Sequence, residues 1–132
     1  MATILAHIHV QQGKATDFEE TISTLYEATH RLEPQCRRYE YWRGAEPNLY
    51  YCLLSFDDFV AFLEHQTSDH HEAPEFGAMI ESLKLEWVDP VQSASELAPT
   101  KSQQLPDNAN QLMTEYAKKF AVEMQAWWQI PD

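Results

Sequence analysis

Five of the six histidines fall into two groups whose side chains could transfer protons. His7 and His9 alternate along a strand-like segment, and His65, His70 and His71 lie in a polar stretch that follows an apolar one. Imidazole is the side chain whose ordinary pKa, about 6.5, lies beside neutral pH. His7 and His9 on one strand face, with a third ligand from 65–71, could also hold a metal. Nothing in the sequence places that third ligand, so we expect no metal.

Aromatic and basic side chains form a second set that could bind a substrate. A flat substrate could lie between the aromatic rings, although rings in a sheet are more often core or dimer contacts, and both interpretations stay open. The aromatic set is Tyr39, Tyr41, Trp42, Tyr51 and Trp87. Three arginines could orient an anionic or phenolate substrate or pair with Glu40 and Glu46; these are Arg37, Arg38 and Arg43.

The elements that must position these residues follow one another in a recognisable order. In chain order we expect a strand at 3–10, a helix that Thr16 caps and Pro34 ends, strands at 36–44 and 49–56, a short helix at 59–63, a helix from Pro74 to Leu83 and a strand at 84–88. The order strand, helix, strand, strand, helix, strand predicts an α+β, ferredoxin-like split βαβ arrangement. Its antiparallel sheet carries helices on one face.

The segment 49–56 is apolar on both of its faces. Leu49, Tyr51 and Leu53 would lie on one face, and Tyr50 and Cys52 on the other. An antiparallel sheet with one wet face alternates apolar and polar residues, and two helices cover only one face. We therefore expect a symmetric homodimer in which the two sheets face each other.

The last 40 residues differ in composition from the rest. Residues 93–107 are rich in Ser, Gln and Pro and predict a linker. Residues 108–132 predict an amphipathic helix whose apolar stripe contains Met113, Tyr116, Phe120, Met124 and Trp127. We expect this helix to dock on its own domain or on a partner chain.

The length and net charge of the chain limit the kinds of partner that it can bind. The 132 residues suit one domain with an appendage, and 9 Lys and Arg against 21 Asp and Glu give a net charge of −12. Such a surface repels nucleic acid and anionic membranes. Without a secretory signal or a long apolar run, and with Cys36 and Cys52 in no metal-binding spacing, we expect a cytoplasmic protein with free thiols.

Three segments together resemble one family. They are the strand and Gly turn at 6–13, the hairpin at 36–56, and the helix at 59–63 followed by His65 and His70, five residues apart. In this order they are similar to the antibiotic biosynthesis monooxygenase domains. The resemblance covers residues 1–92 and implies a dimeric α+β barrel.

The resemblance also implies an activity. Members of this family include cofactor-independent oxygenases that deprotonate a quinol or polycyclic aromatic substrate, whose anion then reduces O₂. We therefore expect a monooxygenase that uses a small aromatic substrate and O₂ without a cofactor. The family also contains isomerases and domains without known activity, so a non-catalytic small-molecule-binding or interaction domain, or an isomerase, remains the alternative.

A third branch of the family degrades haem, and two positions argue against it here. That branch uses an Asn on the first strand and a Trp on the helix before the histidines. This chain has Ala6 and Phe62 at those places. We therefore do not expect haem degradation.

The family frame ranks the candidate residues. His70, His65 and His9 are the predicted catalytic residues, and His9 could meet His70 in one pocket. The alternatives are a helix-capping or solvent-facing His70, a His65 held at a helix end, and a polar fringe of the dimer interface at His7 and His9. His71 is expected to face solvent. The predicted substrate-binding residues are His7, Tyr39, Tyr51, Phe62, Phe76 and Trp87.

Overall fold

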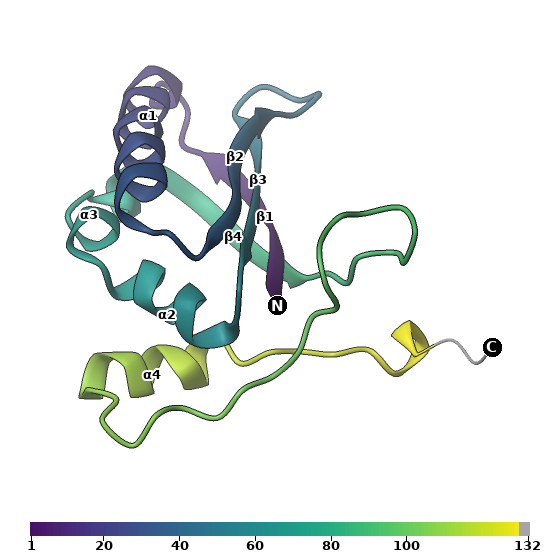
Figure 1. Cartoon of the computed structure of the whole chain (residues 1–132). Coiled ribbons are helices and arrows are strands. Elements are labelled where there is room, and N and C mark those ends of the chain that lie inside the picture. The colour runs from purple at the N-terminus through teal and green to yellow at the C-terminus, as the bar shows by residue number, and fades with distance from the viewer. Residues whose placement is uncertain (130–132) are drawn as a thin grey trace.

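Four antiparallel strands form one sheet in the order β2-β3-β1-β4 (Figure 1). The computed structural model describes residues 1–129. The strands are β1 (Ala2–Val10), β2 (Cys36–Arg43), β3 (Leu49–Phe56) and β4 (Ile80–Trp87). The helices are α1 (Ala15–Leu32), α2 (Phe59–Thr67), α3 (Asp69–Glu72) and α4 (Gln111–Lys119), with 3₁₀ turns at Phe76–Ala78 and Ala126–Trp128.

Alternation along the central strand β1 separates the two faces of the sheet. Ala2, Ile4, Ala6, Ile8 and Val10 are buried under the helices, because every second side chain of a strand points to the same face. β3 runs antiparallel to β1 on one side, and β4 runs antiparallel to it on the other. The core therefore lies between this covered face and the helices.

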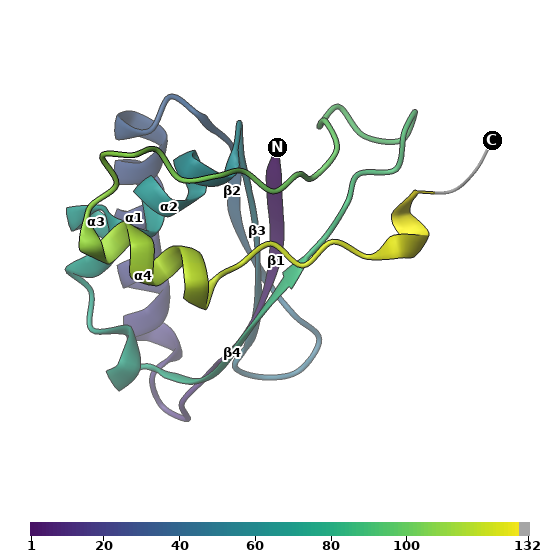
Figure 2. The same ribbon diagram turned by 90° about the horizontal axis from the view of Figure 1, so that it is seen from below.

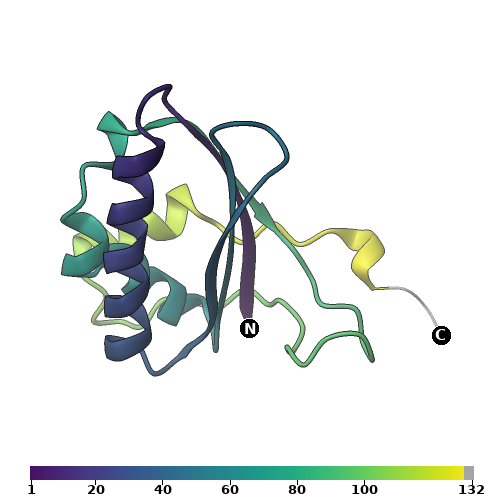
Figure 3. The same cartoon turned by 90° about the horizontal axis from the view of Figure 1, so that it is seen from above.

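All the helices lie on one side of the sheet (Figures 1 and 3). Helix α1 buries Phe18, Ile22, Leu25 and Thr29, which recur at three- and four-residue spacing and so form one stripe. The predicted ferredoxin-like α+β fold is confirmed. No helix in the described part of the chain is long and apolar enough to cross a membrane.

Two predicted helix boundaries are wrong. Helix α1 begins at Ala15 after Lys14, which makes no capping side-chain bond, so Thr16 is not the cap. The helix expected from Pro74 to Leu83 is a single 3₁₀ turn, and β4 already begins at Ile80. Pairing of Ile80 with Val10 and of Leu83 with Ile8 hydrogen-bonds this segment to β1, which a helix there would forgo.

The C-terminal helix is shorter than the predicted 108–132. Asn110 caps α4, whose residues pack against α2, and the rings of Phe120 and Phe62 meet edge to face with centroids 6.0 Å apart. In residues 121–129 only Val122 and Trp128 pack against the core, and the chain runs without helix to the turn at Ala126–Trp128. A short helix without tertiary packing is marginal in water, which explains the early end. Residues 130–132 lie outside the described residues.

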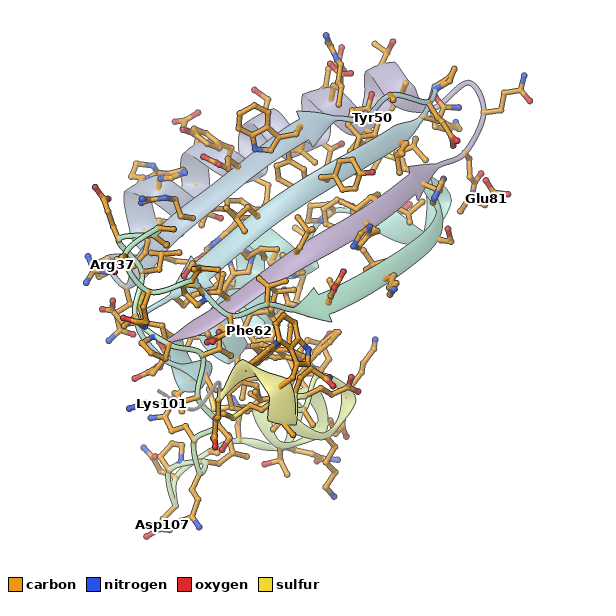
Figure 4. All side chains as sticks on the ribbon, turned by 90° about the vertical axis from the view of Figure 1, so that its right-hand side faces the viewer. Arg37, Tyr50, Phe62, Glu81, Lys101 and Asp107 are labelled. Atoms are coloured by element: carbon orange, nitrogen blue, oxygen red, sulfur yellow. The ribbon has the colours of Figure 1, made fainter. Side chains whose placement is uncertain are left out.

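The other side of the sheet carries no helix, and we call it the open face. Figure 4 looks onto it, with α1 behind the strands. Leu5, Tyr51 and Leu53 are half-buried there, and Trp42 is 60% exposed. As the sequence predicted, β3 is apolar on both faces.

Candidate functional site

A small cavity of about 110 Å³ lies between the covered face of the sheet and the helices. The strands contribute Ala6, Ile8, Tyr39, Tyr41, Cys52, Leu54, Ile80, Leu83 and Leu85 to its wall. The helical side contributes Phe18, Gln66, His71 and Phe76. Leu83 is 51% exposed, so the cavity reaches the surface beside the edge strand β4. The wall is apolar with a few polar groups, which is the usual composition of a small-molecule site.

His71 is the titratable imidazole in this wall. Its ring lies against the rings of Phe76 and His65, with centroids 5.9 and 4.8 Å away. Burial lowers the pKa of His71 to about 3, because desolvation disfavours the imidazolium; a nearby His65 lowers it further, while a hydrogen bond to the backbone of Gln66 opposes the shift. His71 is therefore neutral at physiological pH and offers an unprotonated ring nitrogen.

Two tyrosine hydroxyls provide the second polar feature of the cavity. The Oη atoms of Tyr39 and Tyr41 are 2.7 Å apart and share a hydrogen bond. Burial raises the pKa of both phenols well above their ordinary value, so both stay protonated. One hydroxyl donates to the other, and the proton of the accepting hydroxyl remains available to a bound oxygen atom. Cys52 lies in the same wall as a buried free thiol, and desolvation raises its pKa.

His65 and His70 belong to a separate cluster, built around Glu33 at the end of α1. His65 Nδ1 lies 2.9 Å from Glu33 Oε2, and His70 Nε2 contacts the same oxygen. Burial by itself would raise the pKa of Glu33, but hydrogen bonds and charge from His65 and then His70 outweigh it and lower the pKa. Glu33 is therefore a carboxylate that orients both imidazoles. Glu33 and His70 border a separate groove of about 450 Å³, not the cavity of His71.

The ligand atoms of Glu33, His65 and His70 lie within 4.8 Å of one another, which would suit a metal ion. His65 Nε2, however, is buried without a hydrogen-bond partner. A metal on Nδ1 would place the proton on Nε2 and leave a buried N–H unsatisfied. If Nδ1–H donates to Glu33 instead, Nε2 carries only a lone pair. The cluster therefore suits a hydrogen bond from His65 Nδ1–H to Glu33 better than a metal ion.

The predicted substrate-binding residues divide between cavity and core. Tyr39 and Phe76 line the cavity. Phe62 and Trp87 are buried beside it, with ring centroids 5.6 Å apart, and pack against Phe59. Neither ring lines the cavity, and Trp87 borders the separate groove beside residues 123–128.

The remaining predicted residues lie on the open face. His7 contacts Glu86 at 2.9 Å and the ring of Tyr51 at a centroid distance of 5.5 Å, and His9 is exposed. The expectation that His9 meets His70 is wrong. Alternation turns residues 7 and 9 to the face opposite Ala6 and Ile8, and the helices cover only the latter.

His71 is the principal residue that sequence reasoning placed wrongly, since it was expected in solvent. The signal lay in Ser68, which ends α2 and caps α3 by accepting from the backbone N–H of His71. This break resets the helical register, so that His70 faces Glu33 and His71 faces the cavity. A serine cap three residues before His71 could have revealed it.

We compared the chain with protein families, curated proteins and solved structures. The family model described as antibiotic biosynthesis monooxygenase matches residues 1–74. No curated protein matches the chain.

Solved structures give the same fold. A protein from Caulobacter crescentus, named as a candidate antibiotic biosynthesis monooxygenase, is 25% identical with a TM-score of 0.63, covering 69% of this chain and 90% of its own. A similarly named protein from Bacteroides thetaiotaomicron is 21% identical with a TM-score of 0.64, covering 78% and 95%. The Pseudomonas aeruginosa protein PA3566 is 22% identical with a TM-score of 0.61, covering 68% and 93%.

Proposed function

Because this chain belongs to the antibiotic biosynthesis monooxygenase family, we propose that it is a monooxygenase that oxidises a single-ring quinol or phenol with O₂. The observation that carries the proposal is the apolar cavity with neutral His71 on one wall and the Tyr39–Tyr41 hydroxyl pair on another. A phenolic ring can lie among apolar side chains there while its hydroxyl reaches the imidazole.

The size of the cavity supports one ring over several. A cavity of about 150 Å³ in another protein accommodates benzene, and the volume here is about 110 Å³. A single ring would fill the cavity and extend to its opening beside Leu83, whereas a polycyclic substrate would need the wall near Leu83 and Phe76 to open much further. We therefore place a hydroquinone ahead of the polycyclic aromatic substrates that were also expected from the resemblance.

The chemistry balances without an added reductant. His71 accepts the proton of the phenolic hydroxyl, and the resulting anion gives one electron to O₂. The two radicals combine at a ring carbon, and the proton returned by His71 gives a hydroperoxide. The O–O bond and the C–H bond of that carbon then break, so that one oxygen atom stays on the ring and the other leaves as water with the ring hydrogen. Hydroquinone and O₂ thus give hydroxybenzoquinone and water, and the substrate supplies all the electrons. The neighbouring anion raises the proton affinity of His71, which by itself is a weak base.

The open face supports a homodimer as part of the same proposal. Leu5, Tyr51 and Leu53 are apolar and only half-buried in one chain, and a second sheet would cover them. Light scattering at micromolar concentration should give about twice 15.4 kDa. A mass of one chain would contradict the dimer without bearing on the chemistry at His71.

Oxygen isotope transfer tests the activity. We expect the protein to consume O₂ with methyl-substituted hydroquinones faster than buffer does, and to place one labelled atom from ¹⁸O₂ in the product. A polycyclic quinol should react more slowly than a single-ring one. Binding of hydroquinone without uptake above autoxidation would instead identify a binding domain, and conversion without label would favour an isomerase.

A further inference from the structure

The C-terminal arm, residues 121–129, lies on the side of the sheet away from the helices. Figures 1 and 2 show the chain leaving α4 in the helical layer, passing the end of β4 and ending beyond the open face. Figure 4 shows the arm at the border of this face, while the segment that follows β4 crosses the end of the sheet nearest Arg37 and Lys101 and leaves the rest of the strands uncovered. The arm therefore extends to the side on which a second sheet would pack.

The arm packs on its own chain in part, because Val122 and Trp128 lie against the core. Its backbone hydrogen bonds in the described residues join arm residues to one another, from Trp128 N to Gln125 O and from Gln129 N to Ala126 O. A groove of about 740 Å³ separates the arm from residues 84–92. Val122 and Trp128 are half-buried, and the other arm residues are exposed.

The exposed arm residues are apolar to an unusual degree. Trp127 is 72% exposed and Met124 is 45% exposed. A tryptophan buries a large apolar area when it docks, and exposed clusters of this kind mark interaction sites. Trp127 and Met124 are thus large apolar side chains of the arm that its own chain leaves exposed.

We propose that the C-terminal arm docks on a second copy of this chain, with Trp127 as its anchor, and clasps the proposed sheet-to-sheet dimer. The proposal rests on the dimer named above. In a two-fold arrangement the open faces meet and each arm reaches the other subunit, so two exposed apolar surfaces of the chain are buried together. Helix α4 keeps its place on its own subunit through Phe62 and Phe120.

A second copy is the occupant that the geometry favours. The open face and the arm lie on the same side, so a partner that covers the one is in reach of the other. A fold-back onto its own open face would require the arm to reverse direction where it now runs away from the strands (Figure 3).

The first test measures dimer affinity in the full chain. Trp127→Ser should raise the dimer dissociation constant about tenfold or more, since interface tryptophans are frequent hot spots. Leu112→Ser is the matched control, because Leu112 is an exposed apolar residue of α4 outside the arm. Sedimentation over a dilution series measures both. An unchanged constant for Trp127→Ser in a dimeric protein overturns the arm proposal alone, whereas a monomeric wild type overturns the dimer and the arm together.

The second test identifies the chain that the arm touches. A photo-crosslinking p-benzoyl-phenylalanine at position 127 is introduced into isotopically light and heavy protein, which are mixed before illumination. Docking on a second copy predicts light-to-heavy cross-linked peptides in a dimeric sample. Exclusively light-to-light and heavy-to-heavy products after subunit exchange would place the arm on its own chain and overturn the proposal.

Discussion

On the covered face of the sheet, His71 lies against a cavity among Phe76, Tyr39 and Tyr41. On the open face, His7 pairs with Glu86 and His9 is exposed. Both faces belong to the same four strands and carry aromatic residues beside histidine. They differ in the helices that cover one and not the other. Desolvation by that cover lowers the pKa of His71 and keeps its imidazole neutral.

Replacing one histidine on each face tests this comparison most strongly. His71→Ala should reduce oxygen uptake by about 10²- to 10⁴-fold, the usual contribution of a positioned acid or base. His9→Ala should change the rate less than twofold, because the side chain faces away from the cavity. Steady-state uptake with hydroquinone measures both. Equal losses in the two variants would remove the distinction between the faces.

Shortening one apolar side chain on each face compares how the two faces contribute to the free energy of unfolding. Phe62→Ala should lower the free energy of unfolding by about 3–5 kcal/mol, because a fully buried ring is lost. This loss should not depend on protein concentration. Leu53→Ala removes a half-buried side chain of the open face, and its effect should grow as protein concentration rises, because the lost contact is with the second copy. Urea unfolding at two protein concentrations distinguishes them.

Acid should destabilise the covered face through His71. Its pKa is about 3 in the folded chain and 6.5 in the ordinary state, so the unfolded chain binds the extra proton between these values. Stability should therefore fall as the pH decreases from about 6.5 towards 3, by up to about 1 kcal/mol per pH unit. His71→Asn should flatten this slope. A wild-type slope that survives in His71→Asn would assign the effect to another group.

Below about pH 4.5 the free energy of unfolding should decrease further, because Glu33 becomes protonated. The pKa of Glu33 is lowered in the fold, so its contribution is present above its ordinary pKa of 4.5 and is lost as the pH falls through the folded value. Glu33→Gln should remove this loss of stability below about pH 4.5. The loss of stability that His71 causes between about pH 6.5 and 3 should remain. Glu64→Gln is the control, since Glu64 borders the same groove outside the cluster.

The smallest effect is expected at the edge of the covered face. Glu19 of α1 accepts hydrogen bonds from Arg43 and Tyr50, and these lower the pKa of Glu19 to about 2. Arg43 is largely exposed, so Arg43→Ala should destabilise the chain by less than about 1 kcal/mol, and added salt should shrink the difference. A loss of several kcal/mol would show that this pair fixes the helix to the sheet.

Much of the fold could be predicted because local patterns carry it. Alternation in 3–10 and 49–56 and the stripe of α1 predicted strands and helix correctly. The helix predicted over 74–83 was wrong. Phe76, Met79, Ile80 and Leu83 fit a helical period, but residues from Ile80 onward pair with β1 and form a strand. The site was harder to predict. Tyr39 and Phe76 line the cavity, and their role in binding a substrate stays a prediction. His71 was expected in solvent, because nothing in the sequence pattern alone shows that one capping serine turns two adjacent histidines to different neighbours.

The sequence by itself determined the order of the elements, the acidic surface and the excess of apolar residues on both faces of β3. These follow from residue type and short-range spacing, which need no knowledge of distant neighbours. Only the tertiary structure decided which histidine is desolvated, which two histidines hydrogen-bond to Glu33, and where the helix after Asn110 ends. Each of these depends on groups far apart in the chain that cover, charge or support one another only after the sheet and its helices have packed.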